Sequence, residues 1–208
     1  FGIGIHGHFG AAAADGVLTI TGTGEMPDRE QSYKKSLEFR SRTWLQTVIF
    51  DEGITRIGSY AFYSDGSYKI SSVQLPSTLT SIGEAAFANL GQLTELALPE
   101  GLQTIGKNCF SGAGLTSVTI PSTVLHIGDD AFSNNQALET LFLSEGVESI
   151  GSYSFSDCKS LVSVEWPSTL KKIGEGAFAN CRVLPIPDLT GVEYDPDAAF
   201  DGCASQEE

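Results

Sequence analysis

The chain repeats one short motif, Ile-Gly followed by Phe four residues after the Gly, in six copies spaced 22 to 25 residues apart. A further Phe, Phe200, follows the last copy after 22 residues. Self-similarity at a fixed period of this length is typical of proteins built from stacked identical units. The repeat therefore predicts a solenoid, and this constrains the fold more than any other feature. The Ile positions are Ile57, Ile82, Ile105, Ile127, Ile150 and Ile173.

A second element lies between consecutive motifs, as in "LTSVTIPSTV" at 115–124 and "LETLFLSEGV" at 138–147. Apolar residues alternate with other residues over about five positions, and Pro or Ser ends the run. This period of two predicts short, half-buried strands. The predicted strand cores are 48–50, 73–75, 96–98, 118–120, 141–143 and 164–166.

Each unit then forms one coil, in which a strand, a turn, a third inward apolar residue, Ile-Gly and the Ala-Phe segment follow in order. One coil cannot bury its own apolar edge, but stacked coils share a continuous core. We predict an α/β repeat solenoid. It is a right-handed superhelix with a parallel sheet of about six to seven short strands, and with short helical turns around Phe on the other side. The recurring Phe residues are expected to form a buried column.

Two glycine patterns carry further information. The Gly after Ile recurs in all six copies, which indicates either a positive φ or a backbone too close to its neighbour for a Cβ. The turn after each strand alternates between Glu-Gly and Ser-Thr, as if a unit of two coils had been duplicated.

The stretch "LPSTLTSIGEAAFANLGQLTELALPEGLQTIG" at 75–106 resembles the leucine-rich repeats of BspA-like bacterial surface proteins. The segments "DGVLTITGTGEMPD" and "TWLQTVIFDEGITRIG" resemble the region that precedes the repeats in that family. The resemblance covers roughly residues 15 to 180. It implies a curved solenoid, secretion or attachment to a bacterial cell surface, and adhesive contact with host or matrix proteins.

We expect one domain with three parts. Residues 1–43 form an N-terminal cap of a hairpin and a polar loop, with Asp15-Gly16 as the hairpin turn and Leu18 and Ile20 covering the first coil. Residues 44–188 form the leucine-rich-repeat solenoid. Residues 189–208 form a degenerate C-terminal coil and tail, with Asp195 where Ile belongs.

The charge excludes several partners. The chain has 208 residues, 12 Lys and Arg against 26 Asp and Glu, and a net charge of −14. Binding to nucleic acid or to an anionic membrane surface requires a basic patch, which this composition does not offer. No apolar run is long enough to cross a membrane, so direct membrane insertion is not expected.

No motif predicts catalysis, a cofactor or a metal. The "GIGIHG" at 2–7 lacks the strand and helix of a dinucleotide site. His6 and His8 would need more ligands, and His126, the one other His, stands in a variable and therefore exposed slot. Cys158, Cys181 and Cys203 follow their Phe by three residues, and Cys109 fills a small buried slot. We interpret these cysteines as structural thiols, with a disulfide in the column as the alternative.

The most consistent function is an extracellular protein–protein interaction or adhesion module of a bacterial surface or secreted protein, without enzymatic activity. Its partners would be host or matrix proteins or other cell-surface proteins, and the oligomeric state is left open. The alternatives are a passive spacer in a larger surface protein and a carbohydrate-binding module. The candidate partner-binding residues, taken from the sheet face and from the insertion after Phe62, are Tyr63, Tyr68, Thr119, Thr140, Phe142 and Glu165.

Overall fold

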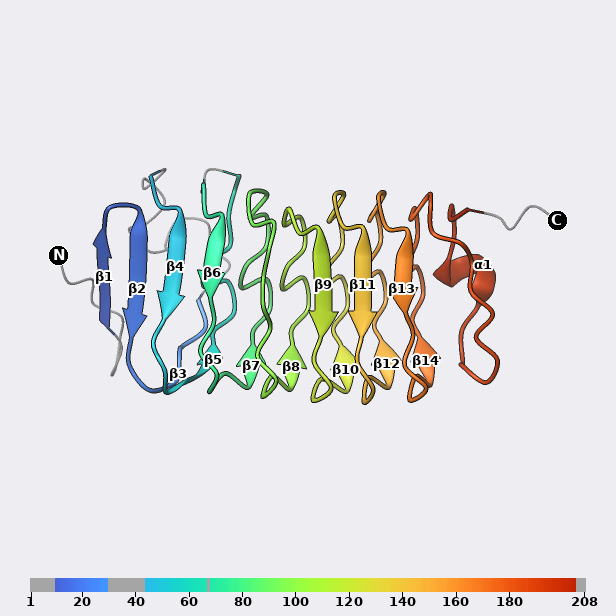
Figure 1. Cartoon of the computed structure of the whole chain (residues 1–208), viewed down its shortest axis with the longest axis horizontal. Helices are drawn as coiled ribbons and strands as arrows, with labels where there is room; N and C mark the ends of the chain where they lie inside the picture. The colour runs from blue at the N-terminus through green and yellow to red at the C-terminus, as the bar shows by residue number, and fades with distance from the viewer. Residues whose placement is uncertain (1–9, 30–43, 67, 205–208) are drawn as a thin grey trace.

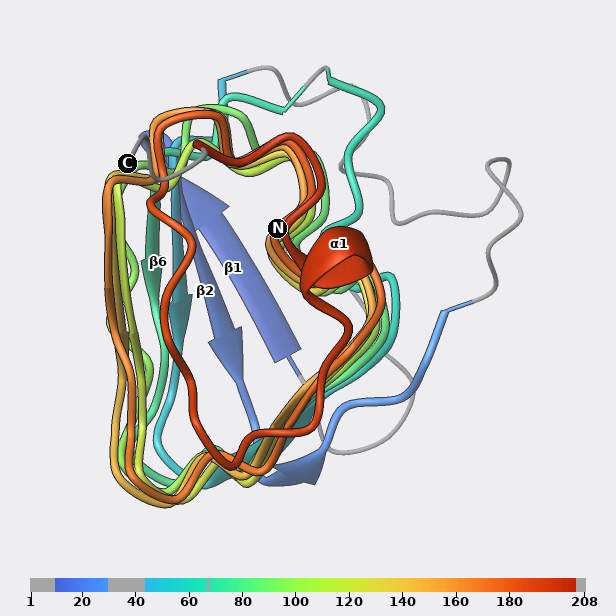
Figure 2. The ribbon, with the colours of Figure 1, turned by 90° about the vertical axis from the view of Figure 1, so that its right-hand side faces the viewer.

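The computed structural model is a solenoid of stacked parallel coils (Figure 1), and it describes residues 10–29, 44–66 and 68–204. Viewed end-on, the coils follow nearly the same outline (Figure 2). The expected parallel architecture is confirmed, and it places the alternating segments of the coils on one side of the solenoid. His6 and His8 lie outside the described residues, as does most of the polar loop expected in the cap.

The outer sheet is built from the alternating segments, and its strands pair in parallel with equivalent residues in register, such as Thr47 with Ser72 and Thr140 with Ser117. It falls into two parts, with the strand orders β1-β2-β4-β6 and β9-β11-β13, in which β1 (Gly10–Ala14) and β2 (Val17–Thr21) form the one antiparallel pair of the described strands. The repeat strands are β4 (Thr47–Phe50), β6 (Ser72–Gln74), β9 (Ser117–Ile120), β11 (Thr140–Leu143) and β13 (Ser163–Glu165).

Residues 96–98 do not form the predicted strand, and Figure 1 shows the trace there without an arrow between β6 and β9. The only backbone hydrogen bond from 94–98 to these neighbouring strand segments joins the Thr116 N–H to the Thr94 carbonyl, at 3.1 Å. The Leu-Ala-Leu sequence contains no β-branched or aromatic residue, the types that best fit a pleated surface. The outer sheet is therefore interrupted at this coil.

A second sheet, which sequence reasoning missed, runs unbroken along the Ile-Gly corners of the coils. Its seven strands pair in parallel in the order β14-β12-β10-β8-β7-β5-β3. They are β3 (Gly24–Glu25), β5 (Ile54–Ile57), β7 (Ser81–Ile82), β8 (Thr104–Ile105), β10 (His126–Ile127), β12 (Ser149–Ile150) and β14 (Lys172–Ile173).

The segments around the recurring Phe are tight turns, and the expectation of short helical turns there is not confirmed. Ala85 has a φ of 50° and Asn89 a φ of 61°, and a left-handed residue ends a right-handed helix. The backbone bonds instead run between coils, as from the Phe87 N–H to the Cys109 carbonyl at 2.9 Å. Within the described residues the one helix is α1 (Pro196–Ala199), which Asp195 caps at its N-terminus.

The Gly of each Ile-Gly pair packs against the backbone of the coil before it. A Cβ on Gly106 would lie 2.7 Å from the Gly83 carbonyl carbon, and one on Gly174 would lie 2.6 Å from the Ser152 nitrogen. None of the six glycines has a positive φ. Close approach is therefore the reason for Gly at this position.

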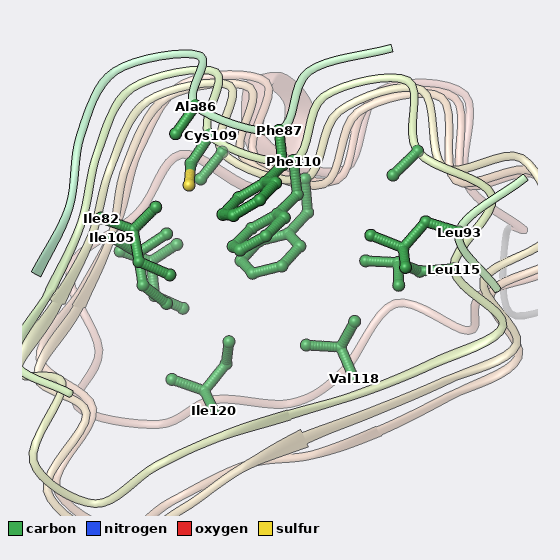
Figure 3. Close-up of a cluster of buried hydrophobic side chains, with 14 of the residues drawn as sticks. Ile82, Ala86, Phe87, Leu93, Ile105, Cys109, Phe110, Leu115, Val118 and Ile120 are labelled. Atoms are coloured by element: carbon green, nitrogen blue, oxygen red, sulfur yellow. The ribbon is translucent and has the colours of Figure 1, made fainter. Parts of the chain in front are cut away.

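The core is a column of stacked Phe rings flanked by aliphatic side chains (Figure 3). Seven rings from Phe62 to Phe200 stack in sequence, with neighbouring centroids 5.2 to 5.6 Å apart. The apolar residue that follows each turn after the outer strand, expected to point inward, is also buried. Leu79 and Val124 are examples, and both have no exposed surface. The predicted Phe column is confirmed.

Different elements close the two ends of the core. At the N-terminal end, β1 (Gly10–Ala14) and β2 (Val17–Thr21) form an antiparallel hairpin, and β2 continues in parallel to β4. The hairpin buries Leu18 and Ile20 completely. At the C-terminal end, the rings of Trp166 and Tyr194 meet Phe200 edge-on, at centroid distances of 6.4 and 5.8 Å.

We predict that Phe132→Ala destabilises the fold by about 3–5 kcal/mol, because truncating a fully buried aromatic ring leaves a cavity. Phe132 is 0% exposed and stacks between two neighbouring rings. Phe142→Ala should change the free energy of unfolding by less than about 1 kcal/mol, because its ring is 37% exposed. Urea denaturation measures both variants, and equal midpoints would show that the buried and exposed faces are wrongly assigned.

Candidate functional site

Three of the candidate residues lie side by side on the outer sheet. Thr119, Phe142 and Glu165 come from β9, β11 and β13 and occupy equivalent positions in the parallel register. Neighbouring strands lie about 4.8 Å apart, so Phe142 stands between a hydroxyl and a carboxylate. Thr140 adjoins them in the next row, and its hydroxyl donates to the Ser117 oxygen at 3.0 Å.

A shallow hollow of about 410 Å³ lies beside this row, where the outer sheet is interrupted. Its lining includes Glu95, Ala97 and Thr119, and the half-buried Leu96 and Leu98 form part of it. Sequence reasoning missed this hollow because it assigned 96–98 to a regular strand. The available signal was the lack of β-branched residues in Leu-Ala-Leu.

The interrupted segment at 94–98 and the strands β9, β11 and β13 belong to four consecutive coils. We call the solvent-facing residues on this side of the four coils the outer face. It carries three acids and no Lys, Arg or His. Within the described structure, none of these acids takes part in an ion pair or a side-chain hydrogen bond. The outer face consists of Thr94, Glu95, Ala97, Thr116, Ser117, Thr119, Glu139, Thr140, Phe142, Val162, Ser163 and Glu165.

The two tyrosine candidates do not join the outer face. Tyr68 is only 7% exposed and belongs to the hydrophobic core. Tyr63 is half-buried, and its ring lies 6.0 Å from that of Tyr60. We therefore leave Tyr68 out of the proposed binding surface.

The cysteines are free thiols inside the solenoid. Cys109, Cys158 and Cys181 have no exposed surface, and Cys203 is partly exposed. The Cys181 thiol donates to the Phe155 carbonyl at 3.2 Å, one coil back. Burial raises the pKa of Cys109, and the hydrogen-bonded thiol of Cys158 raises the pKa of Cys181. Protonated, enclosed thiols are poor nucleophiles.

His126 and the acids form no recognisable metal site in the described part of the chain. The His126 ring nitrogen Nδ1 lies 2.8 Å from the Ser149 hydroxyl. No group of three or more His, Cys, Asp or Glu in residues 10–29, 44–66 and 68–204 is arranged to hold a metal ion. In the same ranges, no helix is long and apolar enough to cross a membrane.

Two of the three Glu-Gly turns have a carboxylate that is hydrogen-bonded to the following coil. The Glu145 carboxylate accepts from the Ser168 N–H at 3.0 Å and from the Ser168 hydroxyl at 2.9 Å. Glu52 and Ser77 repeat this arrangement. The Ser168 N–H, followed by the Ser168 hydroxyl, lowers the pKa of Glu145 below its usual value of 4.5.

A Thr hydroxyl makes a second link at the same junctions. In each of the three Ser-Thr coils it donates to a carbonyl of the Glu-Gly coil before it. These pairs are Thr78 with Ile54, Thr123 with Leu102, and Thr169 with Val147. No side-chain bond links the turn residues Ser77, Thr78, Ser122 or Thr123 to the Glu-Gly pair that follows, within the described chain.

Stacked parallel coils with one buried Phe each define a β-solenoid. The family model described as the BspA type leucine rich repeat region matches six copies over residues 35–139 and 127–208. The chain belongs to this family, and the resemblance seen in the sequence is confirmed. Leucine-rich-repeat proteins generally act as protein-interaction modules, and their solenoid fold is generally non-catalytic.

Solved structures of bacterial repeat proteins share the fold. A leucine-rich-repeat protein of T. pallidum is 28% identical, with 87% of this chain and 89% of that chain covered and a TM-score of 0.65. One from Eubacterium ventriosum is 22% identical, with 90% of this chain and 66% of that chain covered and a TM-score of 0.60. One from Bacteroides ovatus is 20% identical, with 88% of this chain and 59% of that chain covered and a TM-score of 0.55. A search of curated protein sequences gave no match.

We predict that all four thiols titrate as free in the unfolded chain without added reductant. In the native protein Cys203 should react first, because the other three are fully buried. A thiol-specific colorimetric reagent measures both states. Fewer than four reactive thiols in a freshly prepared, unreduced and unfolded sample would contradict the free-thiol assignment.

We predict that Glu145→Gln lowers the melting temperature at pH 7 by about 1–3 °C, because the ionised carboxylate binds Ser168 more strongly than a neutral amide does. The folded-state pKa of Glu145 is depressed, so this stabilisation is present above the ordinary value of 4.5 and is lost as the pH falls through the folded pKa. Melting temperatures at pH 7 and pH 3 should show the difference closing.

Glu100→Gln is the matched control. Glu100 occupies the same turn position and is exposed, but its carboxylate makes no hydrogen bond to Ser122. It should show no such pH-dependent difference. A Glu145→Gln effect that persists unchanged at pH 3 would refute the role of the charge.

Proposed function

We propose that this chain is an extracellular protein–protein interaction or adhesion module of a bacterial surface or secreted protein, and that it binds through the outer face. Its partners are host or matrix proteins or other cell-surface proteins. The proposal is supported by membership of a repeat family that generally mediates protein contacts. Secretion or surface attachment is part of this proposal, as is the absence of catalysis.

The observation that carries the proposal is the position of Phe142. Its ring is 37% exposed on β11, in register with the small side chain of Thr119 and with Glu165. Aromatic side chains supply much of the binding energy at protein interfaces, particularly where surrounding contacts exclude water. The small hydroxyl residues around Phe142 leave a flat surface against which a partner can close.

A carbohydrate-binding module is less well supported. Sugar binding through stacked rings would favour a contiguous cluster of exposed aromatics. Among the described residues, the substantially exposed aromatic side chains are Trp44, Phe142 and Tyr153. They come from separate coils or from different sides of a coil, so they offer no shared platform. A passive spacer needs no exposed aromatic ring and no hollow beside it.

The test is a binding screen of the folded module against purified host-surface and matrix proteins and against glycans. We expect a protein ligand whose affinity falls about tenfold or more with Phe142→Ala, as for an interface anchor. Tyr153→Ala is the matched control, since Tyr153 is 42% exposed but lies in a Phe turn away from the outer face.

Each other outcome assigns a different role. Binding to glycans alone would support the carbohydrate module. No ligand in the screen would support the spacer. A protein ligand that Phe142→Ala leaves unaffected would move the binding surface away from the outer face.

A further inference from the structure

We propose that the outer face binds an extended segment of a partner protein that is rich in Arg or Lys, with one basic side chain in the hollow beside Glu95. This inference rests on the proposed function and specifies the chemistry of the partner. It follows from the shape of the hollow, the charge of the outer face and the position of Phe142.

The hollow accepts a side chain and presents polar groups to it. It is open and shallow, and its lining combines the aliphatic Leu96 and Leu98 with hydroxyl and carboxylate groups. Leu96, Ala97 and Leu98 make no backbone hydrogen bond to β6 or β9. An Arg or Lys side chain has a matching composition, because its methylene stem packs on apolar surface while its head group donates hydrogen bonds.

The charge of the outer face selects a cation. Glu95, Glu139 and Glu165 are all exposed there, and no basic residue accompanies them. Elsewhere on the chain, acids do pair with bases, as Glu148 does with Lys171 at 2.7 Å. A surface of one sign steers partners of the opposite sign and accelerates their association.

Phe142 adds a contact that a simple acidic patch lacks. It lies one strand from Thr119, which lines the hollow, and one strand from Glu165. A cation over an aromatic face is attracted within about 6 Å of the ring centre. The row therefore offers a hollow, a ring and a carboxylate along the solenoid axis, which fits an extended chain with alternating basic residues.

The experiment uses the full chain and three fluorescently labelled, end-blocked nonapeptides of alternating Arg-Ser, Gln-Ser and Glu-Ser. Fluorescence anisotropy measures affinity at about 50 mM and about 300 mM salt, since exposed charges are screened within about 10 Å at moderate ionic strength. We expect the Arg-Ser peptide to bind at least tenfold more tightly than the Gln-Ser peptide, the Glu-Ser peptide not to bind, and added salt to weaken the Arg-Ser complex.

The variants separate a defined site from general attraction to a chain of net charge −14. Glu95→Gln and Phe142→Ala should each weaken the Arg-Ser peptide at least fivefold. Glu100→Gln changes the net charge equally but lies in a turn, so it should change the affinity less than twofold. Melting temperatures within about 2 °C of the unsubstituted protein verify that the variants are folded.

Several results would overturn the inference. These are equal weakening by Glu95→Gln and Glu100→Gln, equal affinity for the Arg-Ser and Gln-Ser peptides, or no binding of the Arg-Ser peptide at millimolar concentration. A protein ligand that Phe142→Ala weakens and Glu95→Gln does not would uphold the proposed function and still refute the basic partner. The two proposals therefore fail on different observations.

Discussion

The spacing between coils depends on the contact between the Gly of each Ile-Gly pair and the backbone of the preceding coil. A Cβ on Gly128 would lie 2.7 Å from the Ile105 carbonyl oxygen, which real side chains do not tolerate. At the resulting separation the corner strands pair without a break, and the Phe rings stack at 5.2 to 5.6 Å. The hydrogen-bonded corner strands and the stacked Phe rings therefore depend on the same spacing between coils. A side chain at this Gly would disturb both contacts.

The parts of the fold that repeat in every coil were predictable from the sequence. A position that stays Phe or Ile while its neighbours vary is a core position, so the Phe column and the inward Leu and Val residues could be assigned. The interruption at 96–98 was missed, because its one sequence signal, the lack of β-branched residues in Leu-Ala-Leu, is only a small difference in β-propensity from the equivalent segments. The residues with positive φ in the Phe turns could not be predicted either, since Ala85 and Tyr153 are not residue types that favour this conformation. In the candidate site, the alternation of apolar and other residues along the strand predicted that Phe142 faces solvent. The hollow beside it was not predicted, because it arises where the strand at 96–98 is missing.

The two sheets have different roles in the molecule. The corner sheet is continuous from β3 to β14, and all six of its repeat strands, from β5 to β14, end in Ile. The outer sheet tolerates Thr, Phe and Glu at equivalent positions of β9, β11 and β13, and it also tolerates the loss of one strand. Because the corner sheet and the Phe column hold the coils together, the outer face is free to vary in shape and charge.

The links between Glu-Gly and Ser-Thr turns have a consequence for how such an array can change in length. Thr169 bonds back to the coil of Glu145, and Thr78 bonds back to the coil of Glu52, so coils are joined as ordered pairs. Removal of one coil by recombination would place two turns of the same type next to each other, and a Ser-Thr turn that follows another Ser-Thr turn would lose the carboxylate that Glu52 or Glu145 supplies to it. Gain or loss of a pair keeps every junction intact. Growth of the array in steps of two coils is therefore favoured, and an engineered extension should copy a pair.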